Sequence, residues 1–153
     1  MTPLFKKLNF KNFERIAVLN APEEFEKELN EMMPFTTIDK AISSAAPYNF
    51  VLAFVKTDAD ITACAELMKE NLADDVVLWF AYPKQSSKKY KSTINRDRGW
   101  SALGQLGYEP VRMVAIDNDW SALRFRNIKN IKNFNRKFGA LSDEGKERIA
   151  GKE

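Results

Sequence analysis

A chain of 153 residues has the usual size of one domain and can bury a core without disulfides or metal. With 44% hydrophobic and 29% charged residues it is not a disordered chain, and its net charge of +3 is too mild to indicate nucleic-acid binding by itself. The lack of histidine excludes Ser-His-Asp, Cys-His and zinc-histidine chemistry, and the single cysteine, Cys64, excludes an intramolecular disulfide.

Strands alternate with helices through the first half of the chain. Residues 15–19 form a short apolar run that predicts a buried strand, and an amphipathic helix follows it. The continuous apolar run at residues 49–55 predicts a central strand, after which Thr57 and Asp60 resemble a capping box that begins the next helix. Residues 76–82 predict another buried strand. A strand, a helix and a strand in this order favour a parallel crossover.

A hairpin near residues 111–126 organises the rest of the expected sheet. Asn118 and Asp119 tolerate the left-handed backbone that a two-residue turn requires, so we place the turn there. Counting outward from this turn places Arg112 opposite Phe125, with apolar side chains on both faces of the ribbon. A ribbon that is buried on both faces belongs in a layered α/β domain.

The expected fold is therefore a three-layer, Rossmann-like α/β domain with a mixed sheet of about five or six strands, mostly parallel, closed by a C-terminal antiparallel hairpin. We divide the chain into an N-terminal extension (1–14), a single α/β domain (15–127) and a helical tail (128–153) that packs on the domain or extends from it. Within the tail, apolar spacing predicts an amphipathic helix over residues 128–138, and a further short helix could begin at Ser142.

The basic loop at residues 84–98 is the first candidate site. It follows a predicted central strand and carries six basic residues and the hydroxyl groups of four serine and threonine residues. Ligands of open α/β sheets bind beyond the carboxyl ends of the strands, which makes this loop a candidate anion site. It contains no glycine and matches no phosphate-binding fingerprint, so a solvated surface loop is the alternative. The candidate anion-binding residues are Lys84, Ser86, Ser87, Lys88, Lys89, Asn95, Arg96 and Arg98.

The hairpin end is the second candidate site, where Asp117, Asp119, Trp120 and Arg124 could converge to bind a cation or to act as acid and base. The alternative is structural, because aspartate at a turn, a tryptophan over a sheet edge and a solvated or paired arginine need no ligand. Cys64 lies on an apolar helical stripe and is expected to be inert core. We assign no catalytic residue, no metal ligand and no cofactor.

Three segments carry a resemblance to a known family: residues 79–84 with their strand-ending Tyr-Pro-Lys, residues 107–111, and residues 114–125 with Asp-Trp-Ser-Ala-Leu-Arg-Phe. Residues 16–126 as a whole resemble an uncharacterised bacterial family, one of the domains of unknown function. The resemblance implies a small cytoplasmic α/β protein and brings no established activity with it.

The order of elements also resembles a shortened nucleotide-binding or methyltransferase-like sheet, which is an analogy of fold and not of function. Leu19-Asn20-Ala21-Pro22 stands where a glycine-rich loop would follow the first strand, which argues against dinucleotide or S-adenosylmethionine binding.

Two functional hypotheses follow. In the first, the chain is a non-catalytic binding or adaptor domain that engages an anionic small molecule or a protein partner through the basic loop. In the alternative, it is a small enzyme, or a degenerate nucleotide- or methyltransferase-like enzyme, that acts on a phosphorylated substrate with Asp117 or Asp119 as acid or base. The longest apolar run has seven residues, so we expect a cytoplasmic protein without a membrane partner, and we do not expect nucleic acid as a partner.

Overall fold

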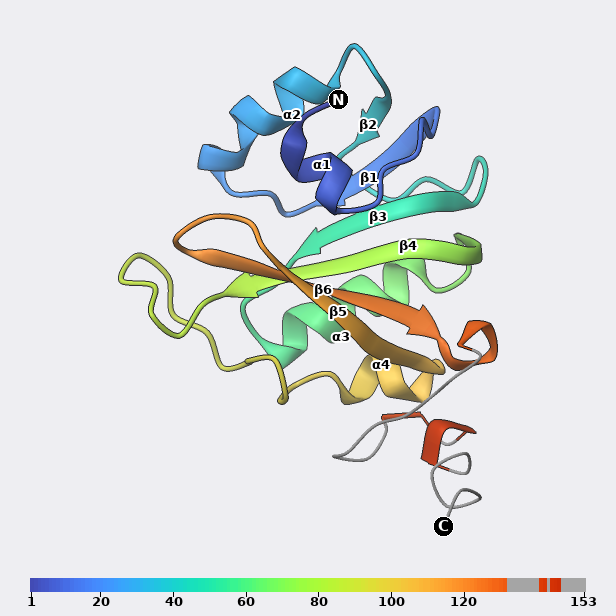
Figure 1. Cartoon of the computed structure of the whole chain (residues 1–153). Coiled ribbons are helices and arrows are strands. Elements are labelled where there is room, and N and C mark those ends of the chain that lie inside the picture. The colour runs from blue at the N-terminus through green and yellow to red at the C-terminus, as the bar shows by residue number, and fades with distance from the viewer. Residues whose placement is uncertain (132–140, 143, 147–153) are drawn as a thin grey trace.

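The computed structural model describes residues 1–131, 141–142 and 144–146, and its six strands form one mixed sheet in the order β2-β1-β3-β4-β6-β5 (Figure 1). The strands are β1 (Arg15–Leu19), β2 (Thr37–Asp39), β3 (Tyr48–Phe54), β4 (Leu72–Pro83), β5 (Tyr108–Ala115) and β6 (Trp120–Asn127). Strands β2, β1, β3 and β4 are parallel neighbours, whereas β6 is antiparallel to both β4 and β5. The expected α/β sheet with a C-terminal antiparallel hairpin is confirmed.

Helices cover the two faces of this sheet and divide the core into two apolar layers. One layer contains α1 (Pro3–Lys7), the 3-10 helix η1 (Glu23–Phe25) and α2 (Glu26–Met32), and the other contains α3 (Asp58–Met68) and α4 (Ser101–Gln105). The first fourteen residues do more than extend the domain, because Phe5 and Leu8 are fully buried and Phe10 is nearly so. Figure 1 shows α1 and α2 over β1 and β3.

Local sequence signals explain the ends of the helices that flank the central strands. Helix α3 begins with the expected capping box, in which the Thr57 side chain accepts from the Asp60 N–H and the Asp60 carboxylate accepts from the Thr57 N–H. Helix α4 is followed by Gly107 at φ +88°, a backbone conformation that glycine adopts without a steric penalty. The start of α3 and the end of α4 therefore follow from the local sequence.

The hairpin differs from the expected one by a single residue. Oδ1 of Asp117 accepts hydrogen bonds from the N–H groups of Asp119 and Trp120, both at 2.8 Å, and Ile116 N–H donates to the Trp120 carbonyl at 3.0 Å. The loop therefore has three residues, and the predicted two-residue turn is wrong. The additional loop residue shifts the pairing of the two strands by one position. Arg112 therefore pairs with Arg124 and not with Phe125, so the side chain opposite Arg112 is one from the other face of β6.

The described part of the tail docks on the edge strand. The carboxylate of Glu109, which is fully buried, accepts hydrogen bonds from the N–H groups of Leu141 and Ser142 and from the Ser142 hydroxyl. Lys146 N–H donates to the Ser142 carbonyl, as a helical turn beginning at Ser142 requires. Residues 128–130 form the 3-10 helix η2 (Ile128–Asn130) and Ile131 is extended, so the expected helix does not begin at residue 128. Residues 132–140 lie outside the described residues.

Among the described residues, no helix has both the length and the apolar character needed to cross a membrane.

Candidate functional site

The carboxyl ends of β1, β3 and β4 lie at one edge of the sheet, and the basic loop at residues 84–98 crosses back over it. The loop is fixed at its start by Lys84 N–H, which donates to the Asp119 carbonyl at 2.8 Å. Further along, Thr93 N–H donates at 3.1 Å to the carbonyl of Lys56, just beyond β3. This is the edge at which open α/β sheets bind their ligands, so the loop has the position that the sequence predicts.

Four aromatic rings from four different segments form a continuous row along this edge. The ring centroids of Phe25 and Phe54 are 4.9 Å apart, those of Phe54 and Trp120 are 5.1 Å apart, and those of Trp120 and Tyr90 are 5.0 Å apart. The first three side chains are almost completely buried. Edge-to-face and tilted rings at these distances attract one another beyond their burial, so this aromatic row closes the edge with the chain's own side chains.

Polar contacts hold Tyr90 at the end of the aromatic row. Its hydroxyl donates to Oε1 of Glu24 at 2.6 Å, while the ammonium groups of Lys56 and Lys89 lie 4.9 and 5.4 Å from its ring centroid. The hydrogen bond to Tyr90 lowers the pKa of Glu24, and the same bond raises the pKa of Tyr90. A tyrosine with a raised pKa is a poor general base near neutral pH, so the contact serves closure better than proton transfer.

Half of the predicted anion-binding residues are engaged in holding the loop together. Ser87 donates to Asp119 at 2.8 Å, Lys89 pairs with Glu24 at 3.4 Å, Arg96 pairs with Asp97 at 3.3 Å, and Asn95 accepts from the Asp97 N–H at 2.9 Å. Within the described part of the chain, the side chains of the other four make no hydrogen bond or ion pair: Lys84, Ser86, Lys88 and Arg98. No contact gathers these four around a common point.

The fold keeps three of the four predicted hairpin residues together at the turn. Asp117 accepts the N–H groups of Asp119 and Trp120, Asp119 accepts the Ser87 hydroxyl, and Trp120 is buried in the aromatic row. Arg124 lies further along β6, opposite Trp79 in β4, and does not reach the turn through any contact.

Asn20 follows β1 directly at φ +58°, so it makes the left-handed turn that a glycine would otherwise make. Its side-chain amide donates to Sγ of Cys64 at 3.7 Å. Burial raises the pKa of Cys64 to about 11, which fits the inert core cysteine that the sequence predicts.

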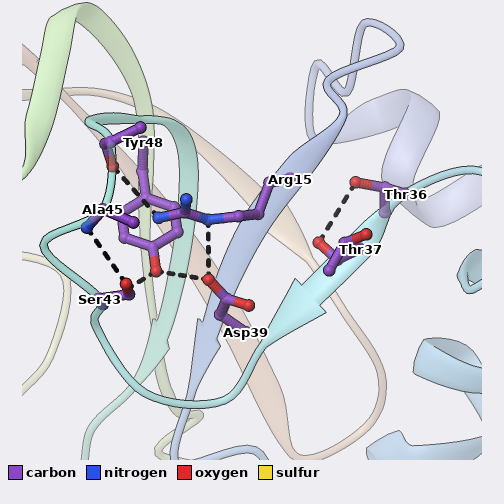
Figure 2. A network of polar contacts seen from close by, with 8 residues as sticks. Arg15, Thr36, Thr37, Asp39, Ser43, Ala45 and Tyr48 are labelled. Atoms are coloured by element: carbon purple, nitrogen blue, oxygen red, sulfur yellow. Dashed lines mark hydrogen bonds and ion pairs between the residues drawn. The ribbon is translucent and has the colours of Figure 1, made fainter.

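Asp39 is a residue of interest that the sequence reasoning missed. It ends β2 and lies about 20 residues beyond the end of β1, the spacing of the acidic residue that binds ribose in dinucleotide-binding sheets. In Figure 2 its carboxylate faces Arg15 and Tyr48. Oδ2 of Asp39 is 2.8 Å from Nε of Arg15 and accepts the Tyr48 hydroxyl at 2.6 Å. Its distance in sequence from β1 could have indicated this residue. Its carboxylate is, however, already bound to Arg15 and Tyr48 of the same chain.

Three solved structures resemble the fold at low identity. They are N-methyltransferase NodS from Bradyrhizobium japonicum WM9 (13% identity, TM-score 0.46, covering 74% of this chain and 73% of that one), a protein of the NADB-Rossmann superfamily from Streptococcus agalactiae (7%, 0.47, 83% and 68%), and the Methanococcus jannaschii fibrillarin pre-rRNA processing protein (10%, 0.45, 76% and 68%). Values this low establish neither a shared family nor a shared activity. No protein-family model and no curated protein matches the chain.

Proposed function

We propose that the chain is a degenerate nucleotide- or methyltransferase-like domain whose cofactor edge has been closed by its own basic loop. The sheet keeps an edge with the carboxyl ends of three parallel strands, where such domains bind their ligands. The observation that carries the proposal is the aromatic row, because Tyr90 packs on Trp120 and is tied to Glu24 where a ligand would otherwise lie.

Two further features support loss of the cofactor site. The turn after β1 contains Asn20 and Pro22 in place of the glycines that let a pyrophosphate approach the backbone closely. The acid of β2, Asp39, is bound to Arg15 and Tyr48 and is not presented to the edge. A domain of this kind acts by binding, and its partner surface lies elsewhere than at the former cofactor edge.

The adaptor hypothesis in its original form, with the basic loop as an anion site, has less support. Lys89 and Arg96 already pair with carboxylates of the chain, which reduces the charge that the loop can offer to a ligand. The other basic residues of the loop form no ion pair with the described residues: Lys84, Lys88, Lys91 and Arg98. An anion bound by the loop would therefore rest on these four side chains.

Isothermal titration calorimetry with S-adenosylmethionine, NAD and ATP tests the proposal. We expect the wild-type chain to bind none of them more tightly than about 1 mM, because Tyr90 and Trp120 fill the edge. Tyr90→Ala, which removes the exposed end of the aromatic row, is the matched variant. Stoichiometric binding of S-adenosylmethionine by the wild-type chain at micromolar concentration would contradict loss of the site.

An active methyltransferase-like enzyme is the second candidate, and the left-handed turn at Asn20 with an acid at the ribose spacing favours it. In such an enzyme the basic loop would open to admit the cofactor. The same titration separates the two, since the enzyme would bind S-adenosylmethionine without any substitution. Transfer of a labelled methyl group to a substrate would then establish the activity.

A further inference from the structure

Two arginines lie side by side on the face of the sheet that carries α1 and α2. Arg112 in β5 is the register partner of Arg124 in β6, and Arg124 is in turn opposite Trp79 in β4. Directly opposed residues of antiparallel strands have Cβ atoms about 5 Å apart on the same face. Arg126 follows two residues after Arg124 and therefore lies on that face as well. We call Arg112, Arg124 and Arg126 the arginine face.

The charges of the arginine face are only partly balanced. Arg126 binds Asp75 through Nε at 3.1 Å and Nη2 at 2.9 Å. Arg124 is half-buried, its Nε is shielded from solvent without an acceptor, and it makes no hydrogen bond or ion pair with the residues that the structure describes. Burial lowers the pKa of the Arg124 guanidinium, and the charges of Arg126 and Arg112 lower it further, whereas the nearby carboxylate of Asp75 opposes the shift. Arg126 thus has Asp75 as its ion-pair partner and Glu109 as its register partner, whereas Arg112 and Arg124 form no ion pair with the described residues.

An unpaired, half-buried guanidinium is unusual because a buried charge is costly unless it is paired. Opposed like charges on neighbouring strands add to that cost. Nothing in the described core requires Arg124 to be charged, since its cross-strand neighbour in β4 is the buried Trp79. An arginine at such a position is explained by an acceptor that the described residues do not supply.

The arginine face is open in the described part of the chain. In Figure 1, α3 and α4 lie behind β5 and β6, and no helix of the described residues lies in front of these two strands. Strand β5 is also the last strand of the sheet, so its outer edge pairs with no other strand of the described chain. Val111, the residue before Arg112, is 42% exposed, whereas Met113 lies on the other face of the sheet, where its sulfur accepts a hydrogen bond from the Tyr82 hydroxyl.

We propose that the arginine face docks an acidic segment of a partner protein, whose carboxylates bind Arg112 and Arg124. The ion pair between Asp75 and Arg126 already shows that a guanidinium of this face can bind a carboxylate. Its geometry is bidentate, as is common for arginine. Arginine is also enriched in protein–protein interfaces relative to the rest of the protein surface. Single-stranded nucleic acid would instead call for exposed aromatic rings, and the exposed apolar side chains of β5 are aliphatic.

Fluorescence anisotropy with the full chain and a labelled oligoglutamate peptide at low ionic strength tests the proposal. We expect Arg112→Gln/Arg124→Gln to weaken binding about tenfold or more, because both proposed carboxylate ligands are removed. The matched control is Lys88→Gln/Arg98→Gln, which removes the same charge from exposed, unpaired cations of the basic loop. The control should weaken binding by no more than about twofold to threefold. Thermal unfolding shows that each variant is folded.

Four outcomes would overturn the proposal. Equal loss in both double variants would mean diffuse attraction to a positive chain, and loss only in the loop variant would return the anion site to the basic loop. Tighter, arginine-dependent binding of a labelled oligothymidylate would indicate a phosphate-bearing partner instead of an acidic protein. Absence of oligoglutamate binding to the folded wild-type chain would also contradict it. These measurements involve neither Tyr90 nor S-adenosylmethionine. Their outcome is therefore independent of whether the cofactor edge is closed.

Discussion

The carboxyl edge and the arginine face differ in how far their charged side chains are paired within the chain. At the edge, Tyr90, Glu24 and Lys89 pair with one another, and Ser87 is paired with Asp119. On the arginine face, Arg124 has no partner among the described residues and two like charges as neighbours. The region where the fold class usually binds ligands thus pairs several of its charged side chains within the chain, although the buried Nε1 of Trp120 has no partner among the described residues, whereas the arginine face leaves its half-buried charge unpaired.

This difference indicates where binding has been retained. A surface that satisfies its own donors and acceptors gains little from a ligand, because the ligand would have to replace good internal contacts. A surface with an unpaired charge gives up stability in the free protein and recovers it on binding. The following predictions test the contrast between the two regions.

The largest expected effect is at the closed edge. Trp120→Ala removes a buried ring that contacts Phe54 and Tyr90, and it leaves a cavity at the centre of the aromatic row. The free energy of unfolding should fall by about 3 to 5 kcal/mol. Urea denaturation measures the change, and a loss below about 1 kcal/mol would show that the row does not hold the edge closed.

The two fully buried tryptophans on this side of the sheet provide the next comparison. Nε1 of Trp79 donates to the Leu8 carbonyl at 2.8 Å, whereas Nε1 of Trp120 has no partner among the residues that the structure describes. Both Trp→Phe changes remove a similar volume, but only Trp79→Phe leaves a buried carbonyl without its donor. We expect Trp79→Phe to cost about 1 to 2 kcal/mol more than Trp120→Phe in denaturant unfolding. Equal costs would mean that the bond to Leu8 adds nothing to the docking of α1.

Replacing an arginine of the open face should have the opposite sign. Arg124→Met keeps the apolar stem beside Trp79 and removes an unpaired charge, so stability should stay constant or rise by up to about 1 kcal/mol. Arg112→Met, at an exposed position, is the control and should change stability by less than about 0.5 kcal/mol. A clear loss of stability in Arg124→Met would show that the guanidinium has a partner within the chain.

The smallest effect concerns the pH dependence of the closed edge. The Tyr90 hydrogen bond lowers the pKa of Glu24 below its unfolded value of about 4.5. The stability from this bond is therefore fully present above that value and is lost as the pH falls through the lower, folded value. Glu24→Gln should reduce the Tm slightly between about pH 6 and 8, and this difference should shrink below about pH 4. A difference independent of pH would contradict the charged hydrogen bond.

Local signals were sufficient to predict most of the fold. The strand at residues 15–19 has the predicted ends, and the capping box of Thr57 and Asp60 begins α3 as expected. Strand β4 starts at Leu72 and not at the predicted Val76. Its first four residues include two exposed aspartates, Asp74 and Asp75, so they form no apolar run that would predict a strand. The burial of Phe5, Leu8 and Phe10 was missed because it depends on packing against distant strands.

The sites were harder to predict because their partners come from distant parts of the chain. The sequence placed the basic loop at the correct edge, but nothing local shows that Glu24, 66 residues before Tyr90, closes it. The arginine face was hidden by the register error. One aspartate side chain, Asp117, lengthens the turn by a residue and thereby brings Arg112 opposite Arg124.

Hydrogen exchange of the backbone amides in the basic loop tests the closed edge most directly. The N–H groups of Lys84 and Thr93 donate to carbonyls of other segments, at 2.8 and 3.1 Å, whereas those of Lys88 and Lys91 make no hydrogen bond within the described chain. We predict that Lys84 and Thr93 exchange at least about a hundredfold more slowly than Lys88 and Lys91 in the absence of ligand. Exchange of all four at the rate of an unfolded chain would mean that the loop does not close the edge.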